Sequence, residues 1–229
     1  MDIILIAGLW LDSSAWADVA PELELLGHNV NALTLPGQGD GDISADLSGQ
    51  VAAVLEAVDK AAEKPMVVGH SAACTLAWIA ADQRPEKVGQ TVLIGGFPST
   101  DSELYADYFE PIDGLVPFPG WDQFEGPDSA DIDNDTKERF VANAIPVPEA
   151  VTKGTVKLSD DRRFSVPVSV ICPEFTPESA KGWIASGEVP ELASATRVEL
   201  IDLDSGHWPM FTKPKVLARL LAQIAESAS

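Results

Sequence analysis

Basic residues are scarce in this sequence, and their scarcity excludes whole classes of partner. Only 15 Lys and Arg stand against 36 Asp and Glu in 229 residues, which gives a formal net charge of -21. Binding to nucleic acid or to an anionic membrane depends on basic side chains that neutralise phosphates. We therefore expect neither nucleic acid nor a membrane surface as a partner of this acidic protein.

Cysteines and long hydrophobic runs are also scarce. The two cysteines, Cys74 and Cys172, lie in apolar runs where small buried thiols are common, so a disulfide framework is not expected. No apolar run approaches the roughly 20 residues that span a bilayer. The N-terminal stretch MDIILIAGLW has an early acidic residue and lacks the basic start of a signal peptide. These features predict a cytoplasmic protein.

Short apolar runs alternate with longer segments of helical periodicity through most of the chain. This alternation is typical of a parallel sheet covered by helices on both faces. We expect a single α/β domain over residues 1–229. The predicted strands are 3–8, 29–35, 66–71, 90–96, 166–172 and 197–203, and the predicted helices are 12–27, 47–63, 72–87, 178–187 and 214–227.

Residues of about 101–160 interrupt the alternation. This interval is rich in Pro, Asp and aromatic residues and contains no convincing strand. Because a structureless loop of this length is unusual in a compact domain, we predict an inserted cap with a helix at 134–144. Its aromatic side chains either form the wall of an apolar substrate pocket or pack the cap onto the sheet. They are Tyr105, Tyr108, Phe109, Phe118, Trp121 and Phe124.

The stretch VVGHSAA, residues 67–73, places Ser71 between a predicted strand and a predicted helix. A serine at this point is either a helix N-cap or a nucleophile on a strained turn, the nucleophile elbow G-x-S-x-G. Gly69 and Ala73 supply the small neighbours that such a turn requires. The context favours the nucleophile.

A serine nucleophile needs a base, and the chain has only three histidines. His28 precedes a strand, and His70 belongs to the elbow and cannot easily turn onto the neighbouring serine. His207 follows the last predicted strand, where the base stands in the order serine, acid, histidine. We predict Ser71 as the nucleophile and His207 as the general base.

An oxyanion hole is expected from two backbone amides, one after the nucleophile and one in the loop after the first strand. Ala72 supplies the first by position, and Leu9 is the most plausible source of the second. The remaining predicted pocket residues flank these groups: Gly8, Trp10, His70 and Trp208.

The chain resembles the α/β-hydrolase superfamily over almost its whole length. The similarity rests on LLGHNVNALTLPG, VVGHSAA, GGFPSTD, VICPEFTPESAKGW and SGHWPM. These stretches are most similar to the compact branch that contains plant methylesterases, hydroxynitrile lyases and small bacterial esterase-like hydrolases. The resemblance implies hydrolysis of a small ester, or a related acyl or cyanohydrin reaction, without metal or cofactor. The expected protein is a monomer or a homodimer.

The sequence departs from these relatives in three places. The first loop has Ala7 where relatives carry His, and the elbow ends in Ala73 instead of Gly. Relatives carry the catalytic aspartate just after the strand VPVSVIC, where this chain has Phe175 or Thr176. Glu174 is the first candidate for the acid and Asp101 is the second. A dyad without an acid is the remaining arrangement.

Three functions are compatible with these residues. The leading one is a serine hydrolase of the carboxylesterase type. A lyase similar to hydroxynitrile lyases is the second, and it would need a pocket lysine, for which the cap offers Lys137, Lys153 and Lys157. The third is a binding protein that has lost catalysis on a hydrolase scaffold.

Overall fold

A six-stranded sheet forms the centre of the molecule. The computed structural model describes residues 1–227, and every strand pair in this sheet is parallel, in the order β2-β1-β3-β4-β7-β8. The predicted strands are all confirmed. Their bounds are β1 (Asp2–Ile6), β2 (Asn29–Leu33), β3 (Met66–His70), β4 (Gln90–Ile94), β7 (Val168–Cys172) and β8 (Val198–Asp202).

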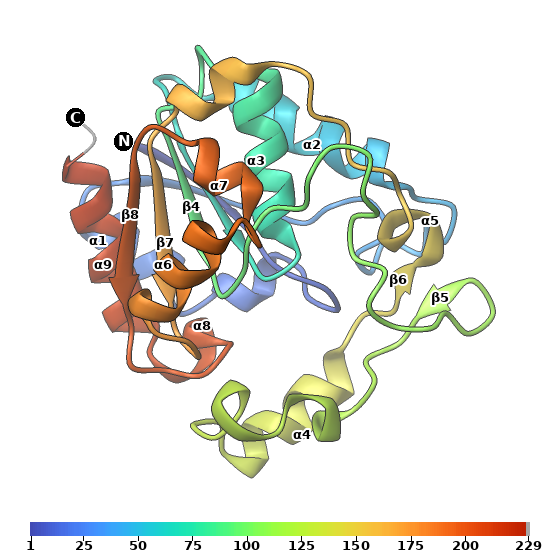
Figure 1. The fold of residues 1–229 in the computed structure, drawn as a ribbon. Coiled ribbons are helices and arrows are strands. Elements are labelled where there is room, and N and C mark those ends of the chain that lie inside the picture. The colour runs from blue at the N-terminus through green and yellow to red at the C-terminus, as the bar shows by residue number, and fades with distance from the viewer. Residues whose placement is uncertain (228–229) are drawn as a thin grey trace.

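Helices cover both faces of the sheet, as Figure 1 shows. Side chains alternate along each strand, so Ile4 and Ile6 enter one core while Ile3 and Leu5 enter the other. The first core is covered by α2 (Leu47–Lys60), α3 (Ala73–Gln83), α6 (Pro177–Ser186) and α7 (Pro190–Ser194). The second core is covered by α1 (Ala20–Leu25) and α9 (Pro214–Ser227).

Three predicted helices are shorter than expected. Helix α2 ends at Lys60 and not at residue 63, and proline explains the other two corrections. The segment 12–27 splits into a 3-10 turn, η1 (Ser13–Trp16), and α1, which begins with Pro21 in its first turn. Helix α3 ends at Gln83 because Pro85 disfavours helical backbone in the preceding residue. Outside the inserted segment, three short elements were not predicted: α7, α8 (Pro209–Thr212) and the 3-10 turn η4 (Asp161–Ser165).

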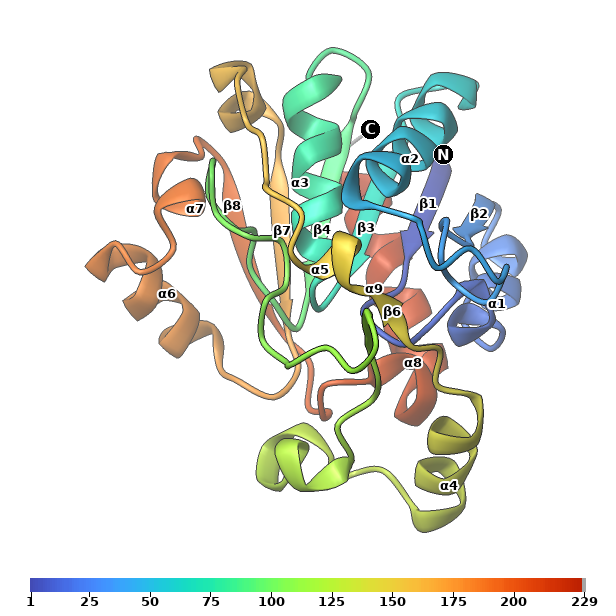
Figure 2. The ribbon, with the colours of Figure 1, turned by 90° about the vertical axis from the view of Figure 1, so that its right-hand side faces the viewer.

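The part of the inserted segment that contains α4 lies beyond the carboxyl ends of the strands, while its last residues run back along α3, where the Ser159 N–H donates to Asp82 (Figure 2). Its main helix, α4 (Asn134–Asn143), is capped by the Asp133 carboxylate, which accepts from the Thr136 N–H at 2.7 Å. The expectation of no strand was wrong, because β5 (Leu115–Val116) pairs antiparallel with β6 (Val147–Pro148). Short helical turns complete it: η2 (Trp121–Phe124), η3 (Gly126–Asp128) and α5 (Glu149–Thr152).

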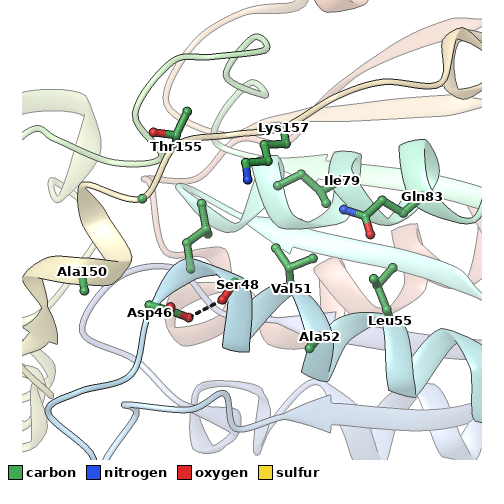
Figure 3. A pocket seen from close by; sticks show the side chains of 12 residues that line it. Asp46, Ser48, Val51, Ala52, Leu55, Ile79, Gln83, Ala150, Thr155 and Lys157 are labelled. Atoms are coloured by element: carbon green, nitrogen blue, oxygen red, sulfur yellow. Dashed lines mark hydrogen bonds between the residues drawn. The ribbon is translucent and has the colours of Figure 1, made fainter.

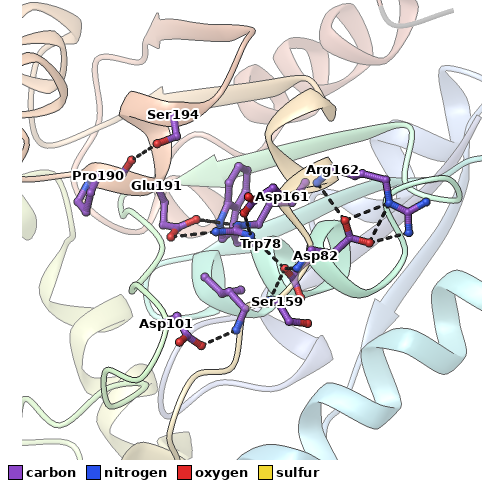
Figure 4. Close-up of polar contacts among 12 residues, drawn as sticks. Trp78, Asp82, Asp101, Ser159, Asp161, Arg162, Pro190, Glu191 and Ser194 are labelled. Carbon is purple, nitrogen blue, oxygen red and sulfur yellow. Dashed lines mark hydrogen bonds and ion pairs between the residues drawn. The ribbon is translucent and has the colours of Figure 1, made fainter.

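A buried ionic cluster fastens α3 to the segments around it (Figure 4). Glu191 Oε2 accepts from Trp78 Nε1–H and from Arg163 Nε–H, both at 2.8 Å. Asp82 Oδ1 accepts from Arg163 Nη1 at 3.3 Å and from the Ser159 N–H at 2.9 Å. Removing one member of such a cluster leaves an uncompensated buried charge, which is strongly destabilising. The cluster therefore fixes the helix that follows Ser71 in the chain.

Both cysteines are buried free thiols. Burial raises the pKa of the Cys74 thiol, and it raises that of Cys172 to about 12. Neither thiol is a reactive group at neutral pH. Within residues 1–227, no helix combines the length and the apolar character that crossing a bilayer requires.

Candidate active site

Ser71 occupies a strained turn between β3 and α3. Its φ angle is 56°, in the left-handed region that side chains other than glycine seldom adopt. The Ser71 N–H donates to the Ile94 carbonyl at 2.8 Å, and the Ser71 carbonyl accepts from the Cys74 N–H at 3.0 Å. A Cβ atom at Gly69 would lie 2.2 Å from the Ala73 carbonyl oxygen, so the turn requires glycine there. The geometry is that of a nucleophile elbow.

His207 and Glu174 form a hydrogen-bonded pair. His207 Nδ1 lies 2.7 Å from Glu174 Oε1, and the two side chains are only 14% and 13% exposed. Gly95 leaves room for them, since a Cβ atom there would lie 3.2 Å from His207 Nδ1 and 3.3 Å from Glu174 Oε2. Oε2 is buried and has no hydrogen-bond partner among the described residues. Among residues 1–227, the imidazole is therefore the one hydrogen-bonding partner of this carboxylate.

The other candidate acids lie elsewhere. Asp101 is exposed, and its carboxylate accepts from the Leu158 N–H at 2.8 Å. The Phe175 ring packs against Phe97 and Trp183, with ring centroids 5.4 Å away in each case. The chain thus turns residue 175 toward an aromatic cluster at α6, while residue 174 meets His207. Among the weighed alternatives, Glu174 is the carboxylate that contacts the imidazole.

Three hydrogen bonds hold the backbone of the loop that carries His207. The His207 N–H donates to the Asp128 carbonyl at 2.8 Å, and the Gly206 N–H donates to Asp131 Oδ2 at 2.9 Å. The third joins His70 Nε2 to the His207 carbonyl at 2.7 Å, so Nε2 carries the proton. Burial, together with nearby His207, lowers the pKa of His70 to about 3. His70 is neutral near pH 7 and holds the loop through this contact.

Two further titratable groups lie near this loop and the cap. Burial raises the pKa of Asp128, while His207 lowers it and the Glu174 carboxylate raises it. Desolvation by neighbouring atoms also raises the pKa of the Tyr108 hydroxyl, although the residue is 66% exposed, and the hydroxyl remains protonated at neutral pH. The surroundings of His207 therefore include two acidic side chains, Glu174 and Asp128.

Ser71 and His207 share a cavity of about 140 Å³, called here the serine cavity. The backbone N–H groups of Leu9 and Ala72 donate to no other residue within 1–227, although both residues are at least nine-tenths buried. Because both residues line the serine cavity, their amides are available as the two donors of an oxyanion hole. The cavity is lined by Leu9, Trp10, His70, Ser71, Ala72, Tyr108, Phe109, Phe124, His207 and Trp208.

Ser71 Oγ makes no hydrogen bond to His207 in this structure; in proteins without substrate such contacts are often long. Gly8 does not line the serine cavity, but a Cβ atom there would lie 2.9 Å from Ser71 Cβ, so glycine permits the close approach of the first loop. None of Lys137, Lys153 and Lys157 lines this cavity. The serine cavity therefore lacks the lysine that the lyase hypothesis requires.

The cap aromatics divide between the two expected roles. Tyr108, Phe109 and Phe124 line the serine cavity. Phe118 and Trp121 instead pack against Phe140 at an angle, with ring centroids 4.8 Å and 5.1 Å from it. Sequence reasoning missed the contacts of Asp128 and Asp131 with the His207 loop, because no local motif marks them.

A larger cavity of about 560 Å³ lies between α2, α3 and the chain at 150–157 (Figure 3). Figure 3 shows Val51, Leu55 and Ile79 on its apolar side and Lys157 above them. None of the residues that the sequence predicted for the site lines it. Its lining has no residue in common with that of the serine cavity.

The fold and the site define a class of protein. A parallel sheet with a strained serine after β3, a histidine after β8 and a carboxylate after β7 is the arrangement of α/β-hydrolases. A model of the alpha/beta hydrolase family matches residues 3–220, and the chain belongs to this family.

Individual relatives agree with this assignment. The chain is 27% identical to Methylesterase 7 of Arabidopsis thaliana, over 97% of this chain and 95% of that protein. Among solved structures, it is similar to an extracellular α/β-hydrolase from a Paenibacillus species that shares homology with tobacco salicylic acid binding protein 2. That match has a TM-score of 0.80 and 20% identity, and covers 97% of this chain and 98% of the other. A pyrethroid hydrolase from Sphingobium faniae matches with a TM-score of 0.73 and 21% identity, covering 99% and 97%.

Proposed function

We propose that this protein is a serine hydrolase that cleaves a small carboxylic ester. The observation that carries the proposal is the serine cavity, which Ser71 and His207 line together with Leu9 and Ala72. The names of the relatives support ester substrates, since they include a methylesterase and a pyrethroid hydrolase. The cavity of about 140 Å³ matches a small ester group.

The reaction follows from the roles of these groups. Ser71 Oγ attacks the ester carbonyl carbon while His207 Nε2 takes the serine proton. The amides of Leu9 and Ala72 bind the oxyanion of the tetrahedral intermediate. His207 returns the proton to the departing alcohol, which leaves an acyl group on Ser71. Water, deprotonated by His207, then releases the carboxylic acid and restores the serine.

Glu174 stabilises the imidazolium that forms in each half of this reaction. Its contact with Nδ1 fixes the tautomer in which Nε2 is free to accept a proton. His70 is excluded as the base, because its Nε2–H is held by the His207 carbonyl and its pKa is lowered to about 3. The acid of this proposal is therefore a glutamate one or two positions before the place that the relatives use.

The test is the turnover of p-nitrophenyl acetate and butyrate by the wild type and Ser71→Ala. We expect Ser71→Ala to lose turnover by at least about 1,000-fold, since no other nucleophile lines the cavity in a suitable position. Ser102→Ala is the matched control, because Ser102 also has a positive φ of 69° but lies in an exposed loop. Equal turnover by wild type and Ser71→Ala would contradict the proposal.

Labelling by a fluorophosphonate separates this function from the binding-protein alternative. The hydrolase forms a covalent adduct that mass spectrometry locates on Ser71. A binding protein without an activated serine stays unlabelled, and this outcome would favour it over the hydrolase.

A further inference from the structure

Two cavities meet at Trp10. One is the serine cavity, and the other, of about 510 Å³, lies between the loop after β1 and α4. Trp10 is the residue that the linings of these two cavities have in common. The second cavity, called here the α4 cavity, is lined by Trp10, Leu11, Asp12, Ser14, Ala15, Asp18, Thr136, Arg139, Phe140, Asn143, Ile145 and Phe211.

Trp10 is held in place by its surroundings. Its φ is 64°, an outlier for a bulky residue, and it is only 5% exposed. Its indole Nε1–H donates to the Val116 carbonyl at 3.2 Å, and its own carbonyl accepts from the Ile145 N–H at 2.9 Å. The rings of Phe109 and Phe118 meet it edge-on, with centroids at 5.2 Å. Contacts on every side thus keep a strained residue between the two cavities.

The size and chemistry of the two cavities differ. Small-molecule sites in proteins usually measure roughly 300–1,000 Å³. The serine cavity, at about 140 Å³, is below this range, while the α4 cavity, at about 510 Å³, lies within it. The walls of the α4 cavity include apolar side chains from Leu11, Phe140 and Ile145. The other half of the lining is polar and includes Asp12, Asp18 and Arg139. An aliphatic or aromatic substituent would therefore lie along the apolar half of the wall.

We propose that Trp10 is the specificity-determining residue that limits the substrate to a short ester, and that the α4 cavity is a subsite for a longer apolar acyl chain once the indole is removed. This inference rests on the proposed ester hydrolysis. Trp10 lies next to the Leu9 amide in the chain, so the boundary between the cavities stands beside the reacting carbonyl. An acyl chain that passes this boundary gains apolar contact in proportion to the area that it buries.

The experiment compares kcat/KM for p-nitrophenyl octanoate and acetate in the wild type and in Trp10→Ala. We expect the octanoate-to-acetate ratio to rise by at least about 30-fold in Trp10→Ala, because the added methylenes become buried. The substitution could displace the neighbouring Leu9 amide and lower kcat/KM for both esters. The ratio of the two values removes this shared loss. Trp10→Leu keeps an apolar side chain at this position and should give a smaller rise if the alanine variant is unstable.

A second substitution tests where the acyl chain goes. Ile145→Trp fills the α4 cavity, so in the Trp10→Ala background it should return the octanoate-to-acetate ratio to near the wild-type value. Leu55→Trp is the matched control, since Leu55 lines the separate cavity between α2 and α3.

An unchanged ratio in folded Trp10→Ala and Trp10→Leu, with acetate still hydrolysed, would overturn the assignment of Trp10 and leave the ester hydrolysis standing. A raised ratio that Ile145→Trp does not lower would overturn the α4 cavity as the subsite. Absence of acetate turnover and of fluorophosphonate labelling in the folded wild type would instead overturn both proposals together.

Discussion

Glu174 reaches His207 from a position where the chain leaves β7, and the direction of each side chain in this loop decides which residue can be the acid. The strand ends at Cys172, and Pro173 then turns the chain. Residue 174 faces the imidazole, and residue 175 faces Phe97 and Trp183. An aspartate at position 175 would therefore meet aromatic rings in place of His207.

Glu174→Ala should lower kcat by at least about 100-fold, because the imidazolium loses its partner and the correct tautomer is no longer fixed. Glu174→Gln should also lose activity, since a neutral amide does not stabilise the positive charge. The second-site change Phe175→Asp in Glu174→Ala should fail to restore turnover. Single-turnover release of p-nitrophenol measures each effect, and Glu178→Ala, on exposed α6, is the control.

Recovery of activity in Glu174→Ala with Phe175→Asp would show that the loop can turn residue 175 toward His207, against the orientation described above. Retention of full activity in Glu174→Ala would favour a Ser71–His207 dyad.

Local sequence patterns were enough to find Ser71 and His207 as candidates, because a strand-to-helix turn and a loop after the last strand are local features. Glu174 stood among open alternatives, since its direction depends on the packing of Phe175 at α6. Trp10 was predicted to flank the pocket. Trp10 also borders a second cavity, because α4 lies opposite it. The position of α4 depends on tertiary packing, so no local sequence pattern predicts this second contact.

At the scale of elements, the cap is tied to the loop after β8. The six strands followed from the pattern of apolar runs, and the cap helix followed from the length of the interval at 101–160. The contact between the cap and this loop, in contrast, joins residues 75 positions apart in the chain. Asp131 Oδ2 accepts from the Gly206 N–H at 2.9 Å and from the Ser205 hydroxyl at 3.1 Å. A Cβ atom at Gly206 would lie 2.4 Å from both the Asp128 carbonyl and Asp131 Oδ1. The position of His207 thus depends on the cap.

Asp131→Ala should lower kcat by about 10-fold with little change in KM. The substitution removes the two hydrogen bonds that Ser205 and Gly206 donate to the carboxylate, so His207 is held less firmly. Asp131→Asn keeps an acceptor oxygen and should retain most of the activity. Gly206→Ala should lose more than Asp131→Ala, since its methyl group pushes the cap from the loop. Steady-state kinetics on p-nitrophenyl acetate check these effects, with Glu138→Ala on the exposed side of α4 as the control.

An equal loss in Asp131→Asn and Asp131→Ala would argue against the acceptor role. A change in thermal stability without any change in kcat would show that the docking supports the fold alone and does not position His207.

At the scale of the whole molecule, the dominant feature is its charge. With 36 acidic and 15 basic side chains, the formal charge is -21. The excess negative charges repel one another, and this repulsion destabilises the folded state. The surface ion pairs do not offset this, because exposed pairs such as Lys60 with Glu56 contribute at most about 1 kcal/mol each. Screening by salt reduces the repulsion over distances beyond the Debye length, which shortens from about 30 Å at 0.01 M to about 10 Å at 0.1 M.

The thermal midpoint should therefore rise when NaCl increases from 0.01 M to 0.3 M, and most of the rise should occur below about 0.1 M, where the Debye length changes most. Sodium perchlorate should produce a similar rise at these concentrations, because screening does not depend on the identity of the anion. The variant Glu24→Gln/Glu125→Gln/Glu138→Gln removes three exposed negative charges and should have a higher midpoint at 0.01 M and a smaller dependence on salt. Differential scanning calorimetry at constant pH measures both quantities. A midpoint that rises with sodium sulfate alone would instead attribute the effect to exclusion of that salt from the protein surface, and the charge of the chain would then not limit its stability.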